Sequence, residues 1–165
     1  MISEERSIED RFHTLTSLLI EKSLTISAME SCSGGLIGVL LSDQEGASAV
    51  VPGGFFTYSN EQKIACGVPA EVIREYGVYS TETARAMART CRDRMHTDIG
   101  IGVTGSIGTI DPNNADSVPG EVYIAVDFCG TIHERRLTLE PADRRISRYR
   151  IADSVAHMVK DLLKG

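Results

Sequence analysis

Residues 24–42 read LTISAMESCSGGLIGVLLS and join three kinds of segment in one run. The first six residues are mostly apolar and predict a short buried strand. A polar turn, ESCSGG, follows at residues 30–35, and its two glycines permit the tight backbone that a strand-to-helix turn needs. The apolar residues after the turn predict a helix over about residues 36–42. A strand that leads through a turn into a helix is typical of α/β folds.

The rest of the chain continues this alternation of helices and strands. We expect Ser7 to be the N-cap of the first helix and Asn60 the N-cap of a short helix that reaches Lys63. Apolar periodicity predicts helices over residues 7–22, 36–42, 60–63, 69–76, 80–96 and 141–163, and strands over residues 24–29, 53–59, 98–104, 121–128 and 131–139. The order of these elements predicts an α/β fold in a single domain of residues 1–165, a three-layer α/β/α sandwich with a mixed, mostly parallel sheet.

Polar segments follow three of the expected strands, at residues 30–35, 57–63 and 104–109. Ligands of open α/β sheets bind at the carboxyl ends of the strands. We therefore expect these three segments to converge on one site.

The composition argues against several classes of protein. Of 165 residues, 42% are hydrophobic and 24% are charged, as in an ordinary globular domain. The 17 basic and 23 acidic residues give a formal net charge of −6, which argues against a nucleic acid or an anionic membrane as the partner. No apolar run is long enough to span a bilayer, and charges occur throughout the first 13 residues. We expect neither a signal peptide nor an anchor, and a cytoplasmic location.

Cysteine and histidine spacing predicts neither a disulfide framework nor a local metal site. The chain contains no CxxC pattern and no HExxH pattern, and both residue types are scattered. We expect free cysteines and no metal site. These residues are Cys32, Cys66, Cys91 and Cys129, and His13, His96, His133 and His157.

The turn at residues 30–35 is the strongest local signal of chemistry. A helix N-terminus offers free N–H groups and the positive end of the helix dipole to an anion or an oxyanion. Ser31 or Ser33 could instead be only an N-cap, with the glycines forming only a tight turn. Cys32 could be a nucleophile with a lowered pKa, although a buried structural thiol is the favoured interpretation.

The block TYSNEQK at residues 57–63 contains a lysine and a tyrosine that could serve a serine nucleophile. A neutral lysine can act as a general base, but an ordinary lysine with a pKa of ~10.4 is neutral in only about one part in 2,500 at pH 7. Burial in a closed pocket could supply the ~4–5 kcal/mol that lowers this pKa to near 7. The alternative is an exposed Lys63 and a Tyr58 packed at a sheet edge.

Three further patterns are weaker. The run GIGVTG at residues 100–105 matches GxGxxG, but its glycines fall inside an expected strand, so we reject a dinucleotide-binding turn. The long loop over residues 105–120 favours a functional segment or disorder, and its start could hold a phosphate through backbone N–H groups. Arg144 and Arg148 share a helix face and could contact a phosphate or a partner, although a solvated face is the favoured interpretation.

Four blocks of the sequence together resemble the C-terminal domain of the competence/damage-inducible protein CinA. They are AMESCSGGLIGVLLSD, GGFFTYSNEQKIACGVP, YGVYSTETARAMA and IGVTGSIG, and the resemblance covers about residues 8–163. The chain is similar to the standalone members of this family, the nicotinamide-nucleotide amidases of the PncC type. The second domain of two-domain CinA proteins is absent from these residues.

The resemblance implies hydrolysis of the carboxamide of nicotinamide mononucleotide to nicotinate mononucleotide and ammonia. By this likeness Ser31 is the nucleophile, Lys63 is its base and Tyr58 is an assisting hydroxyl. Backbone N–H groups at the start of the following helix would stabilise the oxyanion. No cofactor is implied, the partner is a small pyridine mononucleotide, and a homo-oligomer is expected. The residues implied to line the substrate site are Ser33, Gly34, Gly35, Thr104, Gly105 and Ser106.

One loop departs from the family pattern and leaves alternatives open. Family members continue after Thr-Gly with Ile-Ala-Gly-Pro and later Lys-Pro-Val-Gly-Thr-Val, whereas residues 104–122 here read TGSIGTIDPNNADSVPGEV. The loop over residues 106–119 is expected to face the ligand. The chain could therefore be an inactive binding or regulatory module, or an amidase for a different amide.

Overall fold

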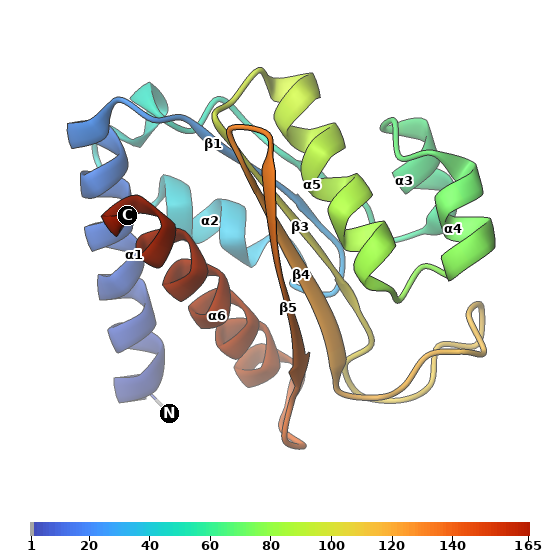
Figure 1. Ribbon diagram of the computed structural model, residues 1–165. Coiled ribbons are helices and arrows are strands. Elements are labelled where there is room, and N and C mark those ends of the chain that lie inside the picture. The colour runs from blue at the N-terminus through green and yellow to red at the C-terminus, as the bar shows by residue number, and fades with distance from the viewer. Residues whose placement is uncertain (1) are drawn as a thin grey trace.

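A five-stranded sheet with the order β2-β1-β3-β4-β5 forms the centre of the structure (Figure 1). Strand β1 (Ile26–Glu30) is parallel to β2 (Phe55–Phe56) on one side and to β3 (Ile99–Gly105) on the other. Strands β4 (Glu121–Phe128) and β5 (Thr131–Thr138) form a hairpin that continues the sheet in the antiparallel sense. This computed structural model describes residues 2–165 and confirms the expected mixed sheet.

Helices cover both faces of the sheet, so the expected three-layer arrangement is confirmed (Figure 1). One face carries α1, α2 and α6, and the other carries α5 with α3 and α4 beside it. The bounds are α1 (Ile2–Lys22), α2 (Leu36–Ser42), α3 (Asn60–Ala65), α4 (Ala70–Tyr76), α5 (Thr81–Met95), α6 (Arg144–Lys164) and a 3₁₀ turn η1 (Ala47–Ala49). The larger core cluster lies under α1 and α6, and a smaller one lies under α5.

Glycines in the middle of β3 let helix α5 approach the sheet closely. A Cβ atom on Gly100 would lie 2.2 Å from the carbonyl oxygen of Ala88, and one on Gly102 would lie 2.2 Å from that of Ala84. No side chain fits at such distances. Both glycines therefore serve helix–strand packing, which confirms that GIGVTG is not a dinucleotide-binding turn.

Several expected boundaries were wrong because tertiary contacts extend or shorten elements. Helix α1 begins at Ile2, so Ser7 lies inside it and is not its N-cap; Glu5 pairs with Arg145 of α6 and fixes this first turn. Ser59, and not Asn60, caps α3, since its side chain accepts a hydrogen bond from the Gln62 amide at 3.1 Å. Only two residues of the expected strand 53–59 pair with β1.

None of the helices in residues 2–165 has the length and apolar character needed to cross a membrane. Over the same residues, no three His, Cys, Asp or Glu side chains gather in a way that could hold a metal ion.

Candidate active site

The carboxyl ends of β1, β2 and β3 meet at one edge of the sheet, because the three strands are parallel. A cavity of about 580 Å³ opens there. Its wall includes Ser31 after β1, Tyr58 after β2 and Ser106 after β3. The three polar segments that follow these strands therefore do converge, as the sequence predicted.

Ser31 begins a tight turn that α6 supports from outside. The turn is closed by a hydrogen bond from the Gly34 amide to the Ser31 carbonyl at 2.9 Å. Gly34 has a φ of 68°, and a Cβ atom there would lie 2.6 Å from the guanidinium carbon of Arg148. Arg148 in turn donates from Nε to the Cys32 carbonyl at 3.3 Å. The left-handed backbone at this position favours glycine, and Arg148 packs against the turn.

Lys63 lies behind Ser31 with its side chain almost fully enclosed. The residue is 2% exposed, and its Nζ lies 3.1 Å from Ser31 Oγ and 2.8 Å from the Thr57 carbonyl oxygen, to which it donates. Burial disfavours the ammonium form and lowers the pKa of Lys63 to about 8, although nearby acidic groups oppose this shift. A neutral amine beside a hydroxyl is the arrangement that a serine nucleophile requires.

Glu30, the last residue of β1, occupies the N-terminus of helix α2. Its buried carboxylate accepts hydrogen bonds from Ser33 Oγ at 2.7 Å, from the Ile37 amide at 3.0 Å and from the Gly38 amide at 2.7 Å. Burial raises the pKa of Glu30 in spite of these donors. The expectation that the first amides of this helix serve an oxyanion was therefore wrong for Ile37 and Gly38, because Glu30 already takes their hydrogens.

Tyr58 lies at the mouth of the cavity and contacts a residue of α6. Tyr58 is 57% exposed, and its hydroxyl accepts a hydrogen bond from Arg144 Nη2 at 2.7 Å. Arg144 also donates from Nη1 to the Ile107 carbonyl at 3.0 Å and lines the cavity. The favoured interpretation of Arg144 as part of a solvated face was therefore incomplete, since this guanidinium is part of the site.

The residues expected to line the substrate site divide into two groups. Gly105 and Ser106 do line the cavity. The Ser33 and Thr104 side chains are buried and bonded inside the protein, to Glu30 and to the Val78 carbonyl respectively. Gly34 shapes the turn, and Gly35 lines a separate hollow between α2 and β2. A direct role for this second group in substrate binding stays a prediction.

Cys32 lines the cavity but has the properties of a structural thiol. It is buried, and burial raises its pKa to about 12. A thiol with so high a pKa is protonated at neutral pH and is a poor nucleophile. The favoured interpretation of Cys32 as a buried thiol is therefore supported by its environment.

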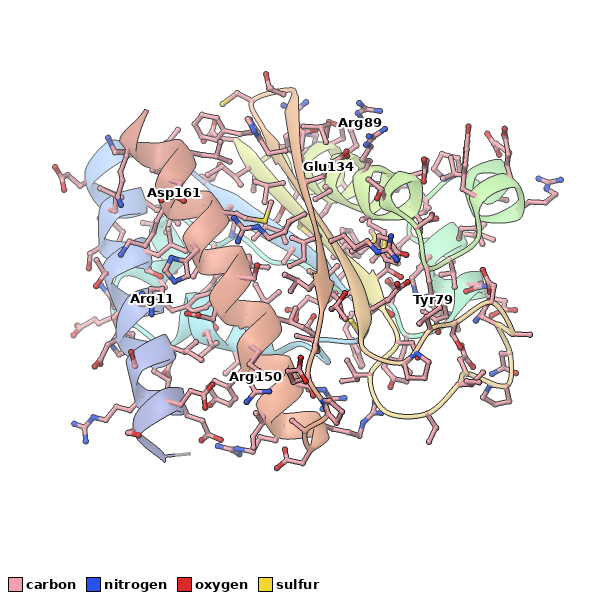
Figure 2. All side chains as sticks on the ribbon, turned by 60° about the horizontal axis from the view of Figure 1, so that its bottom comes forward. Arg11, Tyr79, Arg89, Glu134, Arg150 and Asp161 are labelled. Carbon is pink, nitrogen blue, oxygen red and sulfur yellow. The ribbon has the colours of Figure 1, made fainter. Side chains whose placement is uncertain are left out.

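A hydrogen-bonded group of side chains closes the cavity on the side of the long loop. Asp111 accepts hydrogen bonds from the Tyr79 hydroxyl at 2.6 Å and from Asn114 Nδ2 at 2.7 Å. Asn60 of α3 donates from Nδ2 to Asn114 Oδ1 at 3.0 Å, which joins the loop to the helix that carries Lys63. Figure 2 shows Tyr79 beside this loop. The run DPNNADS indicated turns, but not what they would contact.

Comparison with known proteins identifies the family. Residues 9–163 match the sequence model of the CinA C-terminal domain. The chain belongs to the CinA C-terminal domain family. It is 42% identical over 132 residues to a CinA-like protein of Gemmatimonas aurantiaca, covering 79% of this chain and 30% of that protein. It is 36% identical over 160 residues to a CinA-like protein of Dictyoglomus turgidum, covering 96% of this chain and 38% of that protein.

Solved structures of CinA proteins share the fold. The competence/damage inducible protein CihA from Agrobacterium tumefaciens superposes with a TM-score of 0.87 at 29% identity and 96% coverage of both chains. A CinA superfamily protein from Klebsiella pneumoniae gives a TM-score of 0.88 at 22% identity, over 95% of this chain and 98% of that one, which shows a common fold. The chain spans about a third of the length of the curated CinA relatives that it matches.

Proposed function

We propose that this chain hydrolyses the carboxamide of nicotinamide mononucleotide, giving nicotinate mononucleotide and ammonia, with Ser31 as nucleophile and Lys63 as base. The observation that carries this proposal is the 3.1 Å contact between Lys63 Nζ and Ser31 Oγ, made by a lysine that is 2% exposed. The contact lies within hydrogen-bond reach, as a nucleophile and its base require. Membership of the CinA C-terminal domain family supports the same reaction class.

In the first half of the reaction, neutral Lys63 accepts the Ser31 proton while Oγ forms a bond to the amide carbon. The tetrahedral intermediate then collapses as the carbon–nitrogen bond breaks, and Lys63 returns the proton to the departing nitrogen, which leaves as ammonia. Amides of the Ser31 turn at Cys32 and Ser33 are the remaining nearby candidates to stabilise the oxyanion, since Glu30 holds those of Ile37 and Gly38.

The second half of the reaction hydrolyses the acyl-enzyme. Lys63 accepts a proton from water as the water oxygen attacks the ester carbon. When the bond from that carbon to Oγ breaks, Lys63 returns the proton to Ser31 and restores the starting state. The products are nicotinate mononucleotide and ammonia. The new carboxylic acid loses its proton at neutral pH, and ammonia takes up that proton as ammonium.

Arg144 is the residue that we propose for the substrate's phosphate. The protein as a whole is acidic, with a formal charge of −6, so an anionic substrate needs a local cation. Arg144 lines the same cavity as Ser31, and its recorded partners, Tyr58 and the Ile107 carbonyl, are uncharged. Guanidinium groups suit phosphate oxygens well because they donate two parallel hydrogen bonds. Tyr58 would orient Arg144 here, and its expected role as an assisting hydroxyl stays a prediction.

The test is ammonia release from nicotinamide mononucleotide by the wild-type protein and by Ser31→Ala and Lys63→Met variants. We expect release by the wild type and a loss of about a thousandfold or more in each variant, because nucleophile and base act as a unit. Lys22→Met, which removes an exposed lysine at the end of α1, is the matched control and should retain the wild-type rate.

Turnover by Lys63→Met at the wild-type rate would contradict the proposed base. A folded wild-type protein that binds the mononucleotide in calorimetry without releasing ammonia would instead be an inactive binding module. This is the alternative suggested by the altered loop at residues 106–119. Release of ammonia from other amides alone would identify a different amide substrate.

A further inference from the structure

The charges on the cavity wall do not suit a substrate that is only an anion. Among the described residues that line the cavity, Glu61 and Asp111 carry carboxylates and Arg144 carries the one guanidinium. On the wall itself the two acidic groups outnumber the one basic group, and Lys63, with a pKa of about 8, lies behind the wall at Ser31. A phosphate at Arg144 therefore enters a site that also holds negative charge. A ligand that also carries a positive charge, placed near the carboxylates, would be complementary to this wall.

Asp111 is held in place as an ionised acceptor. Tyr79 and Asn114 both donate to Oδ2, and the Asn113 amide donates to Oδ1 at 2.9 Å. These donors lower the pKa of Asp111, with Asn114 the largest cause, so the carboxylate is ionised at neutral pH. A fixed charge acts on a ligand without the reorganisation that a mobile side chain would need.

Asp111 also acts on the reacting end of the cavity. Its negative charge is one of the groups that oppose the lowering of the pKa of Lys63, so its field reaches the amine beside Ser31. Tyr79 lines the cavity next to Asp111, and its hydroxyl is engaged by that carboxylate. An aromatic ring and a carboxylate together are the chemistry that recognises a delocalised organic cation.

We infer that Asp111 recognises the positive charge of a pyridinium ring, which makes this site selective for cationic N-substituted nicotinamides over neutral ones. The inference deepens the proposed function and rests on it, because the oxidised mononucleotide carries such a ring. Arg144 would hold the phosphate, and Asp111 with Tyr79 would face the ring. Hydrolysis adds a second negative group to the ligand, so the same carboxylate would favour release of the product.

The test measures binding in a Ser31→Ala background, in which the amide survives. Oxidised and reduced nicotinamide mononucleotide form one pair of probes, since they share the phosphate, the ribose and the carboxamide and differ in the charge of the ring. The 1-methylnicotinamide cation, which is methylated on the ring nitrogen, and nicotinamide, which is neutral, form a second pair without phosphate. Calorimetry gives the dissociation constant of each probe.

We expect Asp111→Asn to weaken binding of the cationic member of each pair by about tenfold and to leave the neutral member unchanged. Asp116→Asn removes the same charge from an exposed position of the same loop and is the matched control, expected to change neither. Should Asp111→Asn disturb the loop, Glu61→Gln removes the other carboxylate of the cavity wall and should shift the preference in the same direction.

Equal weakening of cationic and neutral probes would overturn the inference, because it would show that Asp111 only supports the loop. Unchanged binding of all probes in Asp111→Asn, or no preference for cations in the parent protein, would overturn it as well. The second pair separates this inference from the proposed function. A protein that releases no ammonia from the mononucleotide, yet binds 1-methylnicotinamide through Asp111, would contradict the reaction and support the charge selectivity.

Discussion

Lys63 has an environment that is unusual for a lysine. Lysine side chains are seldom fully buried, yet Lys63 is 2% exposed and donates to the Thr57 carbonyl. With its pKa lowered to about 8, roughly a tenth of the molecules carry the neutral amine at pH 7. An ordinary lysine would be neutral about two hundred times less often. Burial therefore provides the large increase in the fraction of neutral amine that a general base needs.

The pH dependence of turnover follows from this lowered pKa. The proposed mechanism uses the neutral amine as the base, so we expect kcat/KM for ammonia release to rise about tenfold per pH unit below 8 and to level off above it. Initial rates between pH 6 and pH 9.5, with circular dichroism as a control for folding, would measure it. A rate that stays constant across this range would contradict general-base action by Lys63.

Sequence patterns singled out residues that lie together in a local block, and they missed residues whose neighbours are distant in the chain. Ser31 and Lys63 were identified from the ESCSGG and YSNEQK blocks, and the structure brings their side chains into contact. Asp111 was not identified, because its importance comes from Tyr79, which is 32 positions away in the chain. No local spacing encodes such a partner.

At the scale of elements, the close approach of α5 to β3 is the packing feature most sensitive to substitution. Gly100 and Gly102 allow it, because a Cβ atom at either position would overlap the backbone of the helix. The sequence placed these glycines in a strand correctly. It did not reveal that α5 packs directly on them.

Gly102→Ala should destabilise the protein by about 1–3 kcal/mol or more, because the added methyl group overpacks the contact with Ala84. The melting temperature in thermal unfolding would measure the effect. Gly165→Ala at the C-terminus, where the nearest atom is 3.8 Å from the added Cβ, is the control and should unfold like the wild type. A Gly102→Ala variant with an unchanged melting temperature would mean that the two elements can separate without loss.

At the scale of the whole molecule, the buried amine at the site lowers the stability of the fold. Folding moves the pKa of Lys63 from its ordinary 10.5 to about 8, so the unfolded chain binds more protons than the folded one between these values. The protonated amine therefore costs the folded protein stability below pH 8. This cost decreases as the pH rises from 8 to 10.5 and is absent above the unfolded value. Activity and stability therefore oppose each other at this residue.

The free energy of unfolding should show this linkage when wild type is compared with Lys63→Met. We expect the difference between the two proteins to move in favour of the wild type by about 3 kcal/mol as the pH rises from 8 to 10.5. Urea unfolding at several pH values would measure it, and the comparison cancels the titration of groups common to both proteins. A difference that does not vary with pH would show that burial does not perturb Lys63.

Sequence patterns alone indicated the α/β class, the order of most elements, the family, and Ser31 and Lys63 as candidate site residues. These follow from local periodicity, turn residues and motif blocks, which are properties of neighbouring positions. The homo-oligomer stays a prediction. The folded chain revealed that Glu30 accepts hydrogen bonds from amides at the start of α2, that Arg144 contacts Tyr58 at the cavity mouth and that Asp111 lines the cavity. These contacts link residues on different elements, and the packing of the whole chain sets their distances.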